Sequence, residues 1–379
     1  MSNGAWPSEG ASTTSTRVAR NTFKIVKSVD IMRLRSRDMG FEAHRLVQGE
    51  AMPFQDQDYV LLRGGQILAV HGHCHPPEHL VGELAFVPSA TGDYAFFGTR
   101  YRKAYVAGGR GMSEREREHI RFPTGTCFDH AHPFSMKSLV PLSHVELHLS
   151  AAVDPLAEAA PGSFLYRYAE AHMTELASIL GDAMPTTPLG LTGSARLLLK
   201  DRAVQSMHDY DVVFTGGPQL VGLIARRLTD YGQVHEEARL REHGKGWRIR
   251  LRTSAGILCP FFRYSTPSDA PITGFTAAQT LLQAVTVSGR VVEDAHSAYL
   301  PTLLTIAPER ASVSLPGELD RRLLVLVSHM RDRGDFFIGD RGTFTGALCH
   351  LSTAQGDLQV LSVVDGSDSS LDTPPWPHY

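Results

Sequence analysis

Cysteine is scarce in this sequence, and the cysteines that are present are not paired. No Cys-x-x-Cys spacing occurs, which argues against a disulfide framework or a thiolate zinc knuckle and favours a reducing compartment. No apolar run is long enough to cross a bilayer, and the sequence has neither a Walker loop nor a dinucleotide-binding glycine fingerprint. We therefore expect a soluble, cytoplasmic protein outside those two nucleotide-binding classes. The four cysteines are Cys74, Cys127, Cys259 and Cys349.

A strong charge of one sign is also lacking. The formal net charge is −3, although arginines concentrate in residues 100–121 and 226–252, so a nucleic-acid partner is neither required nor excluded. With 379 residues, of which 42% are hydrophobic, the chain is long enough for about two or three domains with real interiors.

Turn punctuation and hydrophobic periodicity predict an α+β protein in which a central mixed sheet with helices is flanked by two β-rich domains. Short β-type runs dominate the first half, and residues 164–180 place apolar side chains at helical spacing. A mixed-charge segment, 113–121, suits a solvated helix. The expected parts are a flexible N-terminus at 1–20, a β-rich domain at 21–155, the central domain at 156–280, a small β-barrel or sandwich at 281–365, and a flexible tail at 366–379.

The central domain combines the parts that nucleotidyl transfer needs. A short strand at 189–192 precedes Gly193 and Ser194, and a strand at 210–214 follows a short helix and a loop. Glycine lets the backbone approach a phosphate, and Ser194 with the following helix start can donate hydrogen bonds to it. Asp209 and Asp211 alternate and so share one face of their strand, where they can hold Mg²⁺ or Mn²⁺.

This pattern resembles the signature of the polymerase-beta-type nucleotidyltransferase superfamily, a hydrophobic strand ending in Gly-Ser and followed after a loop by Asp-x-Asp. The resemblance implies phosphate positioning by Gly193 and Ser194 and metal coordination by Asp209 and Asp211. More widely, the chain resembles predicted nucleotidyltransferases best known from archaea. That resemblance is carried by His-Pro-Pro at 75–77, Phe-Val-Pro at 86–88, Tyr-Arg-Lys at 101–103, and the stretches 288–306 and 338–348.

One part of the superfamily pattern is missing. Active members bring a third carboxylate from a later strand, yet residues 247–264 contain no Asp or Glu, and Cys259 occupies the stretch where that carboxylate is expected. Further nucleotide contacts are expected from basic residues in the loop before the acids and along the strand at 247–252. These candidates are Lys200, Arg202, Arg250 and Arg252, with Arg248 on the same strand face; an ordinary solvated strand face is the alternative.

A separate cluster of histidines provides a second candidate site. His71, His73 and His75 alternate, so they would share one face of a strand, and three imidazoles can bind Zn²⁺. A nearby group could complete such a site, whereas the alternative is an ordinary set of turn and surface histidines. That group consists of Cys127, Asp129, His130 and His132.

The sequence thus predicts a metal-dependent nucleotidyltransferase that moves a nucleoside monophosphate from an NTP to an unidentified acceptor. The catalytic and metal residues would be Asp209 and Asp211, and the cofactor Mg²⁺ or Mn²⁺. The alternatives are a non-catalytic nucleotide- or RNA-binding protein with the same fold, and a histidine-based metalloenzyme. A structural alternative also stands, in which a glycine turn lies near two exposed strand-end aspartates.

Overall fold

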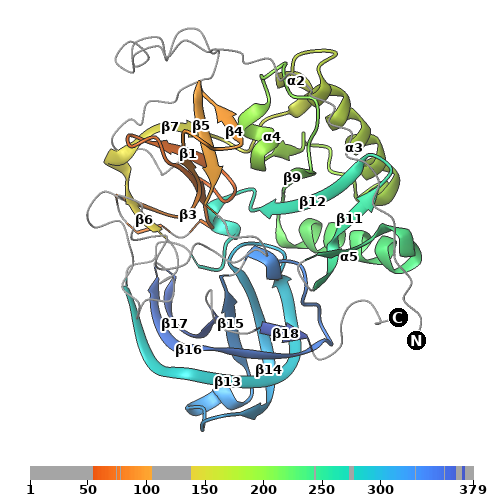
Figure 1. Cartoon of the computed structure of the whole chain (residues 1–379). Helices are drawn as coiled ribbons and strands as arrows, with labels where there is room; N and C mark the ends of the chain where they lie inside the picture. The colour runs from red at the N-terminus through yellow and green to blue at the C-terminus, as the bar shows by residue number, and fades with distance from the viewer. Residues whose placement is uncertain are drawn as a thin grey trace, which may run out of the picture. The chain divides into compact units, whose positions relative to one another are not determined.

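A computed structural model describes most of the chain (Figure 1). The described residues are 54–104 except 74 and 77, 138–272 except 243 and 244, 277–363 except 329 and 354, and 369–371. They belong to one compact unit, His44–Tyr379. Within them, helices combine with strands of three sheets, so the fold is mixed α+β.

The first sheet is antiparallel and has seven strands, in the order β4-β5-β3-β2-β1-β7, with β6 also paired to β3. Val60, Leu62, Leu68 and Val70 alternate along β1 and β2 and are fully buried in its core. The strands are β1 (Tyr59–Leu62), β2 (Ile67–Val70), β3 (His79–Pro88), β4 (Tyr94–Phe96), β5 (Thr99–Lys103), β6 (Ser138–Pro141) and β7 (Val145–Leu149).

The second sheet is mixed and lies against two long helices. Its order is β10-β11-β12-β9-β8, with β9 and β12 parallel and the other pairs antiparallel. Its strands are β8 (Gly190–Leu191), β9 (Asp209–Thr215), β10 (Arg239–Glu242), β11 (Lys245–Thr253) and β12 (Gly256–Arg263). The helices are α2 (Pro155–Glu158), α3 (Phe164–Leu180), α4 (Gly193–Leu198) and α5 (Pro218–Val234).

The helices begin where the sequence offers capping residues. The Ser163 hydroxyl accepts a hydrogen bond from the Tyr166 N–H at the start of α3, and Pro218 occupies the first turn of α5. The apolar faces of α3 and α5 pack on one face of the sheet, against residues such as Tyr210, Leu258 and Phe262. The opposite face of β9 and β12 therefore carries the alternate residues, which include Asp209, Asp211 and Cys259.

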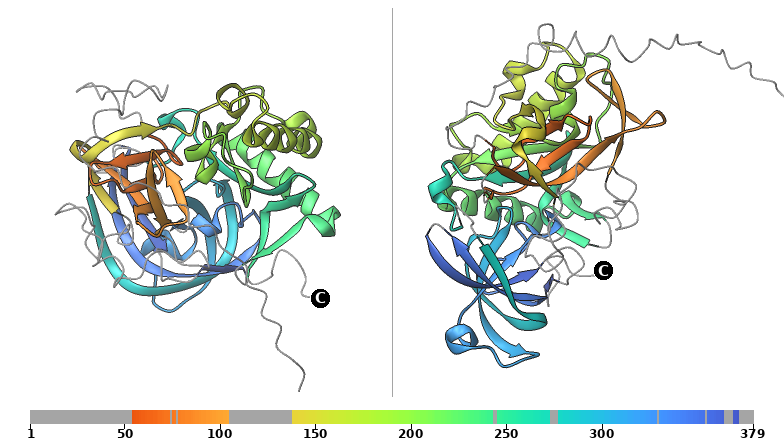
Figure 2. Two further views of the ribbon diagram at one scale, coloured as in Figure 1. Left: turned by 45° about the horizontal axis from the view of Figure 1, so that its top comes forward. Right: turned by 90° about the vertical axis from the view of Figure 1, so that its left-hand side faces the viewer.

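The third sheet closes into a barrel (Figure 2). Strands pair in the order β13-β14-β15-β17-β16, and β16 pairs back with β13; β15 and β17 are parallel, which is a Greek-key order of the OB type. Valine, leucine and phenylalanine side chains fill the interior. The strands are β13 (Ala277–His296), β14 (Thr302–Ala311), β15 (Leu323–Val327), β16 (Arg341–Thr353), β17 (Gly356–Val363) and β18 (Ser369–Leu371), which pairs with the start of β16.

Most of the predicted elements are confirmed, and the differences are local. The helix at 164–180 has the predicted bounds. Of the two forms predicted for the C-terminal domain, barrel and sandwich, the structure has the barrel. The barrel's first strand begins at Ala277, inside the range expected for the central domain. The acidic residues Glu236, Glu237 and Glu242 suggest a helix or loop; the first two lie in a short 3-10 helix, Glu236–Ala238, whereas Glu242 ends β10, which pairs with β11. The segments 1–20, 113–121 and 372–379 lie outside the described residues.

Candidate active site

Two aspartates lie side by side on one face of the second sheet. Asp209 and Asp211 are separated by one residue on β9, so their side chains project to the same side. In the parallel register with β12, Asp209 is opposite Ile257 and Asp211 is opposite Cys259. The two acids predicted from the sequence therefore share the face of the sheet that is not covered by α3 and α5.

Gly193 lies directly against the carboxylate of Asp211. The Thr192 N–H donates to the Asp211 carbonyl at 2.9 Å, and the chain then turns at Gly193 with φ +67°. A Cβ at Gly193 would lie 1.8 Å from Oδ2 of Asp211, which no side chain can accommodate without displacing the carboxylate. The glycine thus permits both the left-handed turn and the close approach, and it brings the predicted bend next to the predicted acids.

The sulfur of Cys259 is the third potential ligand beside the two carboxylates. Ligand atoms of Asp209, Asp211 and Cys259 all lie within 4.8 Å of one another. Among the described residues, this is the group of three or more candidate metal ligands that is found at such short spacing. The superfamily pattern predicts a carboxylate in this stretch of β12, whereas the register of β12 on β9 places a thiol there.

Arginine side chains approach the acids from β11. Arg250 is opposite the region of Cys259 in the strand register, and its Nη2 lies 2.7 Å from Oδ2 of Asp209, while its Nη1 contacts Glu242. Arg248 instead binds Asp340 through both terminal guanidinium nitrogens, Nη1 and Nη2, at 2.6 and 3.2 Å. Arg252 is exposed. The solvated strand face considered for these arginines is therefore correct only for Arg252.

The other residues predicted to contact the nucleotide are Ser194, Lys200 and Arg202. Ser194 is the second residue of α4 and is partly buried beside Gly193. Lys200 forms an ion pair with Glu158, 3.4 Å between Nζ and Oε2, so its charge is directed toward α2. Arg202 is exposed in the loop that leads to β9. Gly193 lies against Asp211 and Ser194 follows it in the chain, whereas the Lys200 side chain is paired with Glu158.

Burial and the mutual charges of the site residues shift the pKa values of Asp211 and of two neighbouring tyrosines. Burial and, to a smaller extent, the charge of Asp209 raise the pKa of Asp211 to about 7, while Arg250 opposes the shift. Burial also raises the pKa of Tyr168 to about 12, with Asp209 and Asp211 contributing. The pKa of Tyr59, from β1, is raised by burial and by Asp211. Phenolic hydroxyls from β1 and α3 therefore lie in the electric field of the two carboxylates.

Arg333 reaches the site from the barrel, out of the connection between β15 and β16. Its Nη2 donates to Sγ of Cys259 at 3.3 Å, its Nε donates to the Pro260 carbonyl at 3.0 Å, and its guanidinium lies 3.6 Å from the centroid of the Phe261 ring. This residue was not predicted, because nothing near position 333 in the sequence indicates a contact 74 residues away.

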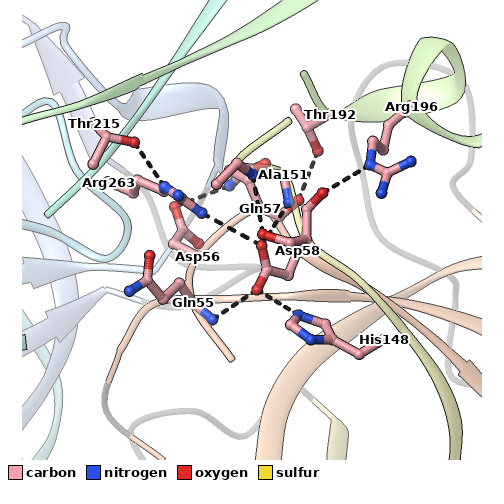
Figure 3. Close-up of polar contacts among 12 residues, drawn as sticks. Gln55, Asp56, Gln57, Asp58, His148, Ala151, Thr192, Arg196, Thr215 and Arg263 are labelled. Carbon is pink, nitrogen blue, oxygen red and sulfur yellow. Dashed lines mark hydrogen bonds and ion pairs between the residues drawn. The ribbon is translucent and has the colours of Figure 1, made fainter. Parts of the chain in front are cut away.

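A buried polar network fixes the first sheet to the strands that carry the site (Figure 3). The carboxylate of Asp58 accepts hydrogen bonds from the N–H groups of Gln55 and Ala151 at 3.0 and 2.8 Å, and it lies 2.7 Å from Nε2 of His148. Arg263, at the end of β12, lies 3.5 Å from Asp58. The network also includes the Thr192 hydroxyl, which donates to the Gln57 carbonyl at 2.8 Å, next to Gly193.

The three alternating histidines do not converge on a common point. Nδ1 of His75 accepts a hydrogen bond from the Val81 N–H at 3.2 Å, His71 lies 3.9 Å from Glu83, and the His73 ring packs edge-on against Tyr264. Burial lowers the pKa of His73 to about 4 and of His75 to about 3. These residues have different partners and form no close ligand group among the described residues. Cys127, Asp129, His130 and His132 lie outside the described residues.

No protein-family model, curated protein or solved structure matches this chain. None of the described helices is both long enough and apolar enough to span a membrane.

Proposed function

We propose that this protein binds a nucleoside triphosphate together with a divalent cation and transfers its nucleoside monophosphate to an acceptor hydroxyl or phosphate. The proposal is supported by one observation above all: Asp209 and Asp211 share a sheet face, and Asp211 lies against the turn at Gly193. Two adjacent carboxylates are oxygen ligands of the kind that hold Mg²⁺ or Mn²⁺.

The surrounding residues suit a polyanionic substrate. The backbone at Gly193 has no side chain to obstruct a phosphate, and the Ser194 hydroxyl lies beside it. Arg252 is exposed and is opposite Ile257, which in turn is opposite Asp209, so a free guanidinium lies two strands from the acids. Lys200 and Arg202 belong to the loop between α4 and β9 and would contact the outer part of the substrate.

The reaction would be an in-line displacement at the α-phosphorus. A bond forms from the acceptor oxygen to phosphorus, the bond to the pyrophosphate oxygen breaks, and the acceptor proton passes to water. A cation held by Asp209 and Asp211 would supply charge compensation for the triphosphate and the leaving pyrophosphate. The chain's own task is to hold the two carboxylates and the phosphate-bearing turn in fixed geometry, which the contact between Asp211 and Gly193 achieves.

The test is release of pyrophosphate from the four NTPs in the presence of Mg²⁺ or Mn²⁺. Asp209→Asn and Asp211→Asn should each lower turnover by about a hundredfold or more, because each removes an anionic metal ligand. Asp230→Asn, on the exposed side of α5, is the matched control and should leave turnover unchanged. Wild-type turnover that survives both substitutions would remove the assignment.

A second function, nucleotide binding without transfer, is favoured by two features of the site. Cys259 lies where the third carboxylate is expected, and Arg250 already neutralises Asp209. Such a protein would bind NTP, measured by equilibrium titration, yet release no pyrophosphate with any acceptor. Loss of NTP affinity in Gly193→Ala, with turnover absent from the start, would favour this second function over the first.

A further inference from the structure

The donor set beside Gly193 differs chemically from a pair or trio of carboxylates. It consists of oxygen from Asp209 and Asp211 and sulfur from Cys259, with all ligand atoms within 4.8 Å of one another. The sulfur is held in this place by the parallel pairing of β12 with β9, in which Cys259 is directly opposite Asp211. The three donors thus belong to two adjacent central strands and have a fixed spacing.

Sulfur and oxygen donors select different cations. Mg²⁺ requires oxygen ligands in near-octahedral geometry, whereas thiolate favours Zn²⁺ and chemically similar borderline cations such as Co²⁺. We propose that Cys259 is a metal ligand and that this site takes a thiolate-accepting divalent cation such as Zn²⁺ in preference to Mg²⁺. This inference rests on the proposed function for the location of the cation and changes the identity of the metal expected there.

The charged neighbours of the site suit a bound thiolate. Cation binding to Cys259 forms a metal–sulfur bond and releases the thiol proton to water. Two carboxylates and one thiolate carry three negative charges, which a divalent cation alone does not balance. Arg333 already donates to Sγ of Cys259 at 3.3 Å, and a hydrogen bond of this kind orients and stabilises a metal-bound thiolate.

Arg250 contacts one of the two carboxylate oxygens of Asp209. Nη2 of Arg250 and Nδ1 of His208 both approach the same oxygen, Oδ2, at 2.7 and 3.7 Å. The contacts of these two side chains therefore lie on one side of the carboxylate, and Oδ1 is the oxygen that would coordinate. The site also requires glycine at position 193, because the Cβ of any larger residue would displace Oδ2 of Asp211.

The test uses the full chain, reduced and free of nucleotide, titrated with Co²⁺. A cysteine ligand gives an intense sulfur-to-cobalt charge-transfer absorption in the near ultraviolet, which carboxylates do not give. We expect this band in the wild type and in Cys349→Ser, which alters a second buried free cysteine of the described residues, and its loss in Cys259→Ser. A wild type without the band, or a band that persists in Cys259→Ser, overturns the inference.

A competition in the wild type alone covers the case in which a variant does not fold. Zn²⁺ at stoichiometric amounts should abolish the cobalt band, whereas Mg²⁺ in roughly thousandfold excess should leave it. Displacement by Mg²⁺ at comparable concentration would contradict the proposed preference. Cys259→Asp supplies a third carboxylate and should reverse the order, with Mg²⁺ affinity raised and Zn²⁺ affinity lowered by about tenfold or more in calorimetric titration.

These outcomes separate the metal ligand from the reaction. A cobalt band that depends on Cys259, in a protein that releases no pyrophosphate, supports the ligand set and contradicts nucleotidyl transfer. Turnover that requires Asp209 and Asp211 with Mg²⁺, in a protein without the band, supports transfer and contradicts the role of Cys259.

Discussion

Gly193 is the residue at which backbone conformation and site geometry depend on each other. Its φ of +67° is unfavourable for an L side chain, and a Cβ would overlap Oδ2 of Asp211. Gly193→Ala should lower the free energy of unfolding by at least about 1–2 kcal/mol, the cost of the left-handed conformation, and should also weaken cation binding. Urea unfolding and metal titration measure the two effects separately.

Gly217 provides the matched control for that substitution. It precedes α5 with φ −75°, and a Cβ there would meet no atom within 4 Å. Gly217→Ala should therefore change stability by less than about 1 kcal/mol and leave metal affinity unaltered. Equal losses in the two variants would mean that the contact between Gly193 and Asp211 has no special importance.

Asp56 links stability to pH. It is 1% exposed, its Oδ1 accepts a hydrogen bond from the Gly72 N–H at 2.7 Å, and burial raises its pKa from 3.8 to about 7. A carboxyl with a raised folded pKa stabilises the fold fully below its unfolded pKa and loses that contribution as the pH rises through its folded pKa. The stability that Asp56 provides is thus greatest below pH 3.8 and is lost as the pH approaches and passes 7.

Asp56→Asn should remove this dependence. The amide can accept the Gly72 N–H bond without ionising, so the variant should gain stability relative to the wild type between about pH 5 and about pH 8. Urea unfolding at both pH values measures the difference, and the contributions of His73 and His75, whose lowered pKa values act in the opposite direction, cancel between the two proteins. A constant difference across this range contradicts the assignment.

At the scale of elements, the Asp58 network joins β1, β7 and β12. Asp58 is 1% exposed and has backbone, histidine and arginine partners, so its removal leaves Arg263 without its ion-pair partner and the buried His148 without its hydrogen-bond partner. Asp58→Ala should cost about 3–5 kcal/mol of unfolding free energy, as expected when one partner of a buried ion pair is lost. Asp93→Ala, in an exposed turn, should change it by less than about 0.5 kcal/mol, and similar values for both variants would show that the network contributes little.

The elements were predictable where local patterns specify them. Amphipathic spacing identifies α3, and short apolar runs identify β9 and β12. β10 was not predicted, because its residues are mostly polar and only pairing with β11 makes them a strand.

The pair of acids and Arg250 were predicted from the sequence, whereas the place of the Cys259 sulfur beside Asp211 and the contact of Arg333 were not. Two aspartates on one strand follow from alternation alone. The position of Cys259 opposite Asp211 depends on the register between strands 48 residues apart, and Arg333 arrives from a different sheet. Such contacts are set by tertiary packing, which leaves no local periodicity in the sequence.

At the scale of the whole molecule, the barrel supplies contacts to the second sheet. The side of the barrel that could bind a nucleic acid is occupied by apolar packing. Leu303 and Leu326 lie on the outer side of β14 and β15, the side on which OB-type barrels bind ligands, and they pack with Ile272 in an apolar cluster. Meanwhile the connection between β15 and β16 directs charged groups at β11 and β12. Asp340 binds Arg248, and Asp332 lies 3.6 Å from Nζ of Lys245.

Arg333 is the residue in this connection on which the coupling of barrel and sheet most depends. It is 5% exposed, donates to the carbonyls of Pro260 and Met330, and covers Phe261. Arg333→Met preserves much of the apolar contact but leaves both carbonyls without that donor, at a cost of about 1–3 kcal/mol. Because the lost bond to Pro260 joins this connection of the barrel to β12, we expect the loss to appear as reduced cooperativity as well as lower stability.

Hydrogen exchange in increasing urea measures that coupling. In the wild type, the amides of β12 and of β16 should lose protection at the same urea concentration, whereas in Arg333→Met the β16 amides should lose it first. Arg310→Met is the control, since Arg310 is exposed on β14, and its two sets of amides should remain coincident. If the two strands open together in Arg333→Met as well, the barrel and the second sheet are coupled through their apolar packing. The role of Arg333 is then limited to its contact with Cys259.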